Sequence, residues 1–164
     1  MANLGLERYL NAHNLQLIRV PIGDRHVVEH MRQYGYNVGG EPSGHIILRD
    51  YATTGDSIIA ALQILAVLVE SKQPASFVGQ IFQSVPQIMH SIRFNNPASL
   101  EHPSVRATIQ TAEAHLKPHG MLLVRRSGTE PLIRIMAQGD DETRLKTVLD
   151  DIMTTIQSVD HKAD

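Results

Sequence analysis

The hydrophobic positions in the first half of the chain alternate between helical and strand spacing. Apolar residues recur at helical intervals in three stretches, and short β-branched runs lie between these stretches. The predicted elements are a helix over residues 4–13, a strand over 15–20, a helix over 24–34, a strand over 45–48 and a helix over 57–69. Asp24 and Asp56 are the expected N-caps of the second and third helices, and Gly35 is the expected end of the second. This order of elements is typical of an α/β domain.

The helix predicted over residues 57–69 is apolar on nearly every side. A helix of this kind is normally surrounded by other parts of the protein, so we expect it to be buried.

The second half of the chain follows a different plan. The predicted elements are a helix over residues 76–82, a strand over 86–94, a helix over 103–116, strands over 121–124 and 132–136, and a helix over 141–159. The last two strands are joined by a short connection, which predicts a hairpin and an α+β domain with an antiparallel sheet backed by helices. The polar segment 70–74 ends in proline and is the predicted boundary, so the expected domains are residues 1–73 and 74–164.

Composition narrows the class of protein. The 164 residues carry a formal net charge of −2 and no basic run, which speaks against binding to nucleic acid. No cysteine is present, which excludes disulfides and thiol chemistry. The longest apolar stretch, residues 58–69, is interrupted by Gln63 and is too short to span a bilayer, and the N-terminus lacks a signal-peptide pattern. We expect a soluble, cytoplasmic protein without a membrane partner.

The connection between the last two predicted strands is rich in groups that bind anions. Arg125 offers a planar guanidinium that matches two phosphate oxygens, and Arg134 follows on the next strand. Ser127 and Thr129 add hydroxyl donors, and Gly128 can take backbone angles that turn successive N–H groups inward. These residues predict a phosphate site. The alternative is an ordinary hairpin turn with solvated arginines, because Gly and Ser are common in such turns.

A glycine-rich loop in the first half carries a second set of polar groups. Glu41 can accept hydrogen bonds from two sugar hydroxyls, and Ser43 can donate or accept. His45 either positions a ligand or only begins the next strand. Arg25 either contacts a ligand or is a solvated side chain on its helix. For the loop as a whole, the alternative is an ordinary polar connection.

Patterns that suggest a metal site are weak. His26, Glu29 and His30 have the spacing of an inverted zinc-protease signature. However, the same helix carries apolar positions that it needs for packing, and the sequence indicates no third metal ligand. Asp24 alone does not provide the several oxygens that a divalent cation requires. We expect no metal in this chain.

Four segments in the same order resemble the alpha-D-phosphohexomutases. They are residues 22–25 (IGDR), 40–47 (GEPSGHII), 53–56 (TTGD) and 125–135 (RRSGTEPLIRI). The resemblance covers nearly the whole chain and implies most of the family's third domain followed by its fourth. It also implies that the glutamate and serine matching Glu41 and Ser43 contact sugar hydroxyls, and that the arginine-rich loop grips the substrate phosphate.

The resemblance also implies a reaction. The chain is most similar to members that interconvert glucosamine 6-phosphate and glucosamine 1-phosphate through a bisphosphate. Pro42 stands where the family usually has glutamine or methionine, which leaves the choice of sugar open. Alternatives are a phosphomannomutase or phosphoglucomutase, and a phosphosugar-binding module without catalysis.

The family's phosphoserine segment and its Asp-rich magnesium loop have no counterpart in this sequence. The resemblance therefore implies that Mg²⁺ is bound by domains absent here, and that the fragment alone is inactive. Expected partners are a phosphosugar substrate and the missing N-terminal domains. An unpaired edge left by a missing first strand would favour dimerisation.

Overall fold

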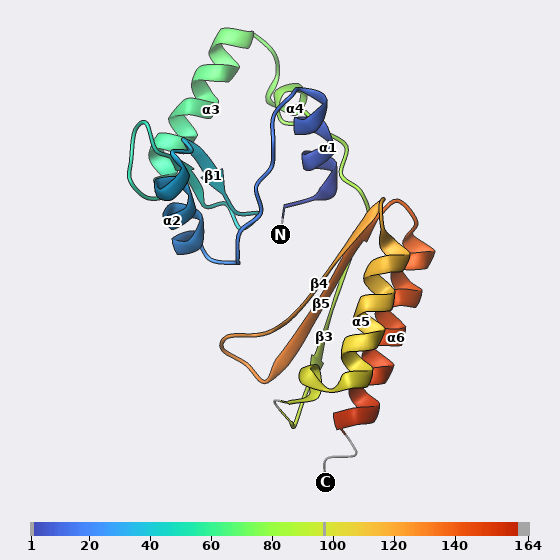
Figure 1. The fold of residues 1–164 in the computed structure, drawn as a ribbon. Coiled ribbons are helices and arrows are strands. Elements are labelled where there is room, and N and C mark those ends of the chain that lie inside the picture. Colours follow the sequence, from blue (N-terminus) through green and yellow to red (C-terminus); the bar gives the residue numbers. More distant parts are fainter. Residues whose placement is uncertain (1, 97, 161–164) are drawn as a thin grey trace. The chain divides into compact units, whose positions relative to one another are not determined.

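The computed structural model describes residues 2–96 and 98–160, which form two compact units (Figure 1). The units divide between Gln83 and Ser84, whereas the sequence placed the boundary after residue 73. Residues 74–83 stay with the first unit, and one reason is visible at Gly5. A Cβ at Gly5 would overlap the carbonyl oxygen of Gln83, so the first helix and this segment lie in direct backbone contact.

The first unit contains four helices and a two-stranded sheet among its described residues. Its elements are α1 (Leu4–Ala12), α2 (Asp24–Tyr34), β1 (Val38–Gly40), β2 (Ile46–Leu48), α3 (Ser57–Ser71) and α4 (Ala75–Val78). The strands are antiparallel, with Gly39 opposite Ile47. A small core forms where Val27 and Met31 of α2 pack with Ile47 of β2. The predicted helices and the second strand are confirmed, whereas β1 was not predicted.

Local signals explain the ends of these helices. Asp56 caps α3 as predicted, since its carboxylate accepts from the backbone N–H groups of Ile58 and Ile59, both at 2.9 Å. Gly35 ends α2 in the left-handed conformation with φ of 76°, which is also as predicted. The N-cap of α2 is Gly23, so the prediction that Asp24 caps this helix is wrong by one residue.

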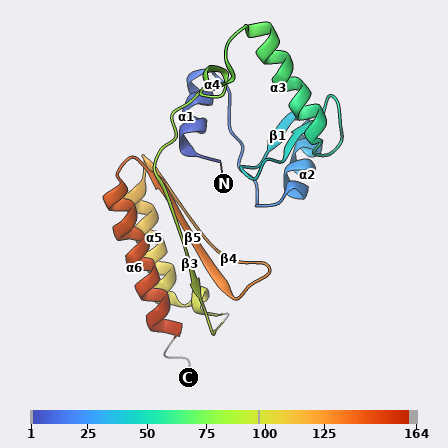
Figure 2. The same cartoon turned by 180° about the vertical axis from the view of Figure 1, so that it is seen from behind.

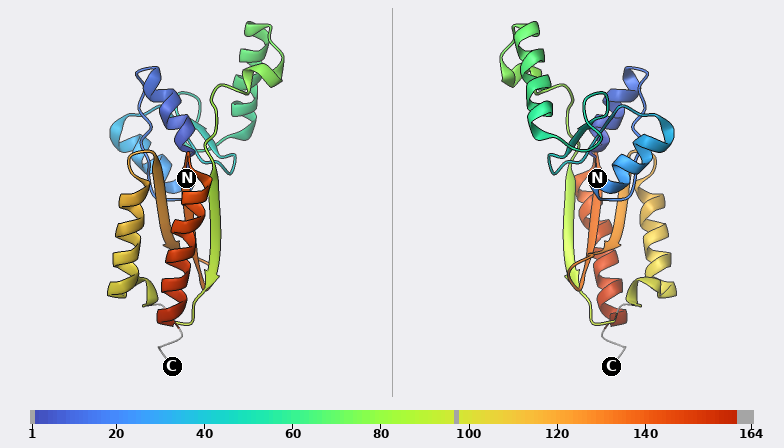
Figure 3. Two further views of the ribbon diagram at one scale, coloured as in Figure 1. Left: turned by 90° about the vertical axis from the view of Figure 1, so that its right-hand side faces the viewer. Right: turned by 90° about the vertical axis from the view of Figure 1, so that its left-hand side faces the viewer.

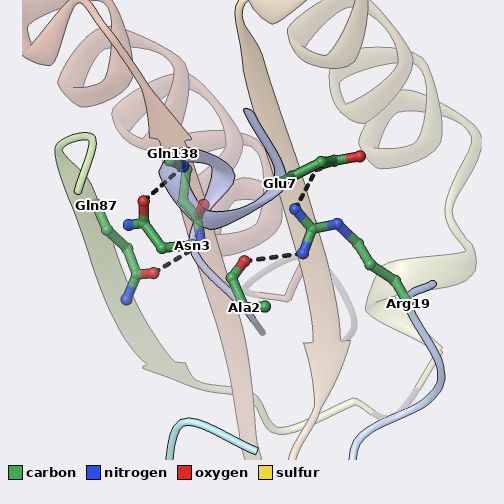
Figure 4. A network of polar contacts seen from close by, with 7 residues as sticks. Ala2, Asn3, Glu7, Arg19, Gln87 and Gln138 are labelled. Carbon is green, nitrogen blue, oxygen red and sulfur yellow. Dashed lines mark hydrogen bonds and ion pairs between the residues drawn. The ribbon is translucent and has the colours of Figure 1, made fainter. Parts of the chain in front are cut away.

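The strand predicted over residues 15–20 is absent. A strand needs a neighbour to receive its backbone hydrogen bonds, and no described strand pairs with this segment. The segment is instead joined to the start of the chain through Arg19 (Figure 4). The guanidinium of Arg19 donates to the carbonyl oxygen of Ala2 at 2.9 Å and to the Glu7 carboxylate at 2.6 Å.

The prediction that α3 is buried is also wrong. Ala60 is its one buried residue, and the exposed fractions of Ile58 and Val69 are 72% and 75%. The apolar surface of α3 is therefore open to solvent along the length of the helix.

The second unit is a three-stranded antiparallel sheet with two helices on one face (Figures 1 and 2). Its elements are β3 (Gln87–Arg93), the 3-10 helix η1 (Ser99–Glu101), α5 (Pro103–Leu116), β4 (Gly120–Arg126), β5 (Leu132–Gly139) and α6 (Glu142–Asp160). The strand order is β3-β5-β4, and α5 and α6 lie side by side (Figure 3). The strands, the helices over residues 103–116 and 141–159 and the hairpin are confirmed. The helix predicted over 76–82 is shorter and belongs to the first unit as α4.

The core of the second unit lies between this sheet and the two helices. Ile133 and Ile135 of β5 are almost completely buried, as are Val105 of α5 and Leu149 and Ile152 of α6. Alternation along each strand places the intervening residues on the opposite face of the sheet. That opposite face carries Arg125 and Arg134, the two residues of the phosphate prediction that are on strands.

The end of α6 is tied to the loop after β3. The carboxylate of Asp160 accepts from the backbone N–H groups of Asn95 and Asn96, at 2.8 and 2.9 Å, and from the hydroxyl of Ser99 at 2.9 Å. Asp160 and Ser99 are both buried. This clamp fixes the loop next to the end of the sheet where β4 and β5 are connected.

Within the described ranges, no helix has the length and apolar character needed to cross a membrane.

Candidate functional site

The loop between β4 and β5 is shaped by its own backbone. The N–H of Ser127 donates to the carbonyl of Leu132, and the N–H of Leu132 donates to the carbonyl of Glu130, both at 2.7 Å. Gly128 and Thr129 are exposed, and their backbone N–H groups donate to no other described residue. The loop therefore holds two backbone donors and a threonine hydroxyl open to solvent.

Two arginines face each other at the base of this loop. Arg125 of β4 is directly opposite Arg134 of β5, and like charges in such a pair are destabilising. Arg134 is offset by Glu130, whose carboxylate lies 3.2 Å from the guanidinium. Arg125 donates from Nη1 to the carbonyl of Arg126 at 3.3 Å, but its buried Nε has no hydrogen-bond partner in the described chain. An anion held between the two guanidiniums would offset both the repulsion and the unsatisfied donor.

The conformation expected of Gly128 is not adopted. Its φ lies outside the left-handed region, and a Cβ at this position would meet no atom within 4 Å. The prediction that Gly128 is there for an unusual backbone angle is therefore wrong. What the glycine provides is open space over the exposed N–H groups.

The turn between β1 and β2 brings three of the predicted sugar-binding residues together. The N–H of Glu41 donates to the carbonyl of His45 at 2.9 Å, and Gly44 closes the turn with φ of 94°. The Ser43 hydroxyl is 2.8 Å from Nδ1 of His45, and this nitrogen is 3.8 Å from the Glu41 carboxylate. The other carboxylate oxygen of Glu41 accepts from the N–H of Gly23 at 2.9 Å. These contacts order Glu41, Ser43 and His45 on one exposed turn.

Arg25 is exposed on α2 and makes its ionic contact within that helix. Its Nε donates to the Glu29 carboxylate at 2.8 Å. This hydrogen bond and the attraction between the charges lower the pKa of Glu29 and raise the pKa of Arg25. The described contacts join Arg25 to Glu29 and not to the turn that carries Glu41.

Sequence reasoning missed an ion-pair network beside the β4–β5 loop. Arg126, next to Arg125, lies 3.5 Å from the carboxylate of Glu101 in η1, and Arg106 of α5 pairs with the same carboxylate. The hydrogen bond and charge of Arg106, followed by the charge of Arg126, lower the pKa of Glu101. Glu101 and Arg106 are five residues apart, but Arg126 is 20 residues further along the chain, so no spacing pattern could have joined it to the other two. The role of Gly23 as a donor to Glu41 was missed for the same reason.

The described residues contain no group of three or more His, Asp or Glu side chains that could hold a metal ion. His26 approaches Glu29 at 3.9 Å, whereas His30 packs in an aromatic cluster with Tyr34 and Tyr36 at centroid distances of 4.5 and 5.7 Å. The donor set of the described chain does not fit Mg²⁺, which needs several convergent oxygens.

Two family models match the chain, one for each half. The model described as phosphoglucomutase/phosphomannomutase, alpha/beta/alpha domain III, matches residues 1–85. The model described as phosphoglucomutase/phosphomannomutase, C-terminal domain, matches residues 89–155. These matches confirm the predicted fold classes and their order along the chain.

Curated relatives agree with these models. A phosphoglucosamine mutase of Parvibaculum lavamentivorans is 51% identical over 157 residues, which are 96% of this chain and 35% of the relative. A phosphoglucosamine mutase of Novosphingobium aromaticivorans is 54% identical over 157 residues, again 96% of this chain and 35% of the relative. The chain thus spans about a third of the length of these relatives.

Solved structures show the same fold at low sequence identity. The N-acetylphosphoglucosamine mutase of Aspergillus fumigatus has a TM-score of 0.79 at 16% identity, covering 98% of this chain and 37% of that one. An N-acetylglucosamine-phosphate mutase of the alpha-D-phosphohexomutase superfamily, solved in its substrate complex, has a TM-score of 0.74 at 19% identity. That match covers 94% of this chain and 37% of the other.

Proposed function

Because this chain belongs to the phosphoglucomutase/phosphomannomutase family, the alpha-D-phosphohexomutases, we propose that it is the substrate-gripping part of a phosphoglucosamine mutase. The whole enzyme would interconvert glucosamine 6-phosphate and glucosamine 1-phosphate through a bisphosphate. The relatives at 51% and 54% identity carry that name, which supports the amino sugar as the substrate.

The observation that carries this proposal is the pair of opposed arginines at the base of the β4–β5 loop. Arg125 has a buried, unsatisfied Nε, and it faces Arg134, which a single carboxylate offsets. A phosphate dianion satisfies this arrangement, while Ser127, Gly128 and Thr129 supply hydroxyl and backbone donors around it. Each charge-assisted hydrogen bond contributes about 1.5–3 kcal/mol.

The sugar ring would be read by the β1–β2 turn. Glu41 and Ser43 offer acceptors and a donor to ring hydroxyls, with His45 ordering the turn and Arg25 near the start of the neighbouring helix. A bisphosphate has to present either end to the phosphoryl-transfer group. A rigid phosphate clamp combined with a few hydroxyl contacts suits a ligand that binds in two orientations.

We propose that this chain binds the substrate but does not turn it over alone. Phosphoryl transfer depends on positioning and on charge around the transferred group, commonly with Mg²⁺. The described residues do not form a magnesium site, so the metal and the transferring group would come from the part of the relatives that this chain does not match. The alternative is a phosphosugar-binding module without catalysis. For such a module, adding the remaining part of the relatives' length would restore no turnover.

The test is an NMR titration with glucosamine 6-phosphate, using inorganic phosphate as the second ligand. We expect both ligands to shift the backbone resonances of Ser127 and Thr129, and only the sugar phosphate to shift those of Glu41 and Ser43. Arg125→Gln should weaken both ligands at least tenfold, because it removes a charged hydrogen bond. Arg144→Gln is the matched control, since Arg144 is an exposed arginine of α6 that approaches Asp141 at 3.9 Å.

Two results would count against the proposal. Equal affinity of wild type and Arg125→Gln would remove the phosphate site from this loop. Release of glucosamine 1-phosphate by the pure chain would show that it catalyses without the rest of the relatives' length. Comparison with glucose 6-phosphate and mannose 6-phosphate tests the choice of sugar.

A further inference from the structure

The face of the sheet that carries Arg125 and Arg134 carries a third arginine, on the strand at the other edge. Ile92 of β3 is in the core with α5 and α6, so Ser91 and Arg93 on either side of it point to the opposite face. The register confirms this placement because Ser91 is directly opposite Arg134. Arg125 is opposite Arg134 from the other side. Each strand of the sheet therefore contributes one arginine to this face.

The three arginines also lie at the same end of the sheet. Arg93 is the last residue of β3, where it pairs with Leu132, the first residue of β5. Arg134 is two residues further along β5, so Arg93 and Arg134 are diagonal neighbours, a relation in which Cα atoms are about 7–8 Å apart and long side chains can meet. Ser91 lies directly opposite Arg134, and its short side chain leaves space on the sheet face beside Arg93.

The charge on this end of the face is unbalanced. Arg93 is exposed and makes no ion pair or side-chain hydrogen bond with any residue that the structure describes. Arg134 forms an ion pair with Glu130, whereas Arg125 has no carboxylate partner in the described chain. Three guanidinium groups thus face a single carboxylate, in a chain whose formal net charge is −2. Such a concentration of one sign of charge attracts an anion of matching size.

We propose that Arg93 is a further phosphate-binding residue, which contacts the phosphate monoester from the β3 side while Arg125 and Arg134 contact it from β4 and β5. The site is then a cradle on the sheet face, closed at one end by the β4–β5 loop. A phosphate monoester with two charges fits three arginines and one glutamate better than a singly charged group does. This inference rests on the proposed function, because it extends the same phosphate site.

The test compares Arg93→Gln and Arg93→Lys with wild type in titrations of inorganic phosphate and glucosamine 6-phosphate. Arg93→Gln should weaken both ligands about tenfold, the size expected for one charged hydrogen bond. Arg93→Lys should recover part of this loss, because it keeps the charge but not the planar fork. The loss should shrink as salt is raised, since the contact is at the surface and is screened. Arg144→Gln should bind as wild type does.

A readout on the unmodified chain avoids dependence on the folding of a variant. The side-chain Nε–H resonance of Arg93 should shift on addition of phosphate, in step with the backbone resonance of Thr129. If Arg93→Gln binds like wild type and the Arg93 resonance does not move, while Arg125→Gln loses binding, Arg93 has no part in the site and the proposed function stands. If wild type binds neither ligand, both proposals are wrong for this chain.

Discussion

Replacing Asp160 should unfold the second unit at much lower denaturant while leaving the first unit unchanged. The carboxylate accepts hydrogen bonds from the backbone N–H groups of Asn95 and Asn96 and from the hydroxyl of Ser99. Asp160→Ala leaves the N–H groups of Asn95 and Asn96 without this acceptor, whereas the hydroxyl of Ser99 keeps the carbonyl of Asn96 at 2.8 Å. Each unsatisfied donor that is shielded from water costs about 1–3 kcal/mol. Water entering the vacated space recovers part of that loss. A negative charge at the C-terminus of a helix is itself unfavourable by about 0.3–1 kcal/mol, so its removal returns a little stability.

The net loss that we expect is about 3 kcal/mol. A unit of this length has a total stability of roughly 4–12 kcal/mol, so the change is a large fraction of it. With a urea dependence of about 1 kcal/mol per molar for a unit of this size, the midpoint should fall by roughly 2–3 M. Asp160→Asn keeps one acceptor oxygen and should lie between Asp160→Ala and wild type.

The chain carries its own control for this experiment. It has no tryptophan, and its four tyrosines, Tyr9, Tyr34, Tyr36 and Tyr51, are all in the first unit. Tyrosine fluorescence therefore reports on the first unit, whereas far-UV circular dichroism reports on both. In Asp160→Ala, the dichroism transition should move and the tyrosine transition should stay. Asp150→Ala, which removes an exposed carboxylate from the same helix, should move neither.

The reasoning is refuted if Asp160→Ala has the urea midpoint of wild type in both signals. It is also refuted if the tyrosine transition moves as far as the dichroism transition, because the clamp would then stabilise the whole chain rather than the second unit.

Three further predictions concern other contacts. Gly5→Ala should destabilise the first unit by about 1–3 kcal/mol, because the added Cβ overlaps the carbonyl of Gln83; tyrosine fluorescence during urea unfolding measures this. Asp56→Ala should cost about 1 kcal/mol and speed amide exchange in the first turn of α3, because it removes the N-cap. Arg106→Gln should raise the pKa of Glu101 toward its ordinary value, as followed by carboxyl NMR. The pKa of Glu101 is lower in the folded state than its ordinary value, so its ion pair stabilises the fold at pH values above the ordinary pKa. This contribution is lost as the pH falls through the lowered pKa of the folded state.

Elements whose signals are local could be predicted from sequence. The helix over residues 103–116 was found with the correct bounds, because Pro103 marks its start and apolar spacing continues to Leu116. The hairpin of β4 and β5 was predicted from two apolar runs around a polar connection. Both conclusions depend only on residues that are neighbours in the chain.

Features that depend on distant partners could not be predicted. Residues 15–20 have the composition of a strand, but composition does not supply a neighbouring strand. The apolar sequence of α3 indicates that the helix should pack against other residues. It does not indicate whether those residues belong to this chain, and the described residues leave the helix exposed. The position of Arg93 on the same sheet face as Arg125 and Arg134 follows from the register of β3 against β5, which the sequence does not show.

Because the apolar surface of α3 is exposed, the folded chain has a feature that is usual in misfolded proteins. The thirteen residues of α3 between the Asp56 cap and Glu70 include no charged side chain, and large apolar side chains such as Leu62 and Leu65 are more than half exposed. Chaperones and proteolytic quality control recognise misfolded proteins by exposed apolar segments, and here the native state presents one. A dye such as ANS should therefore bind the folded chain. The lifetime of the chain in a cell would then depend on whether this helix is covered, and not only on the free energy of folding.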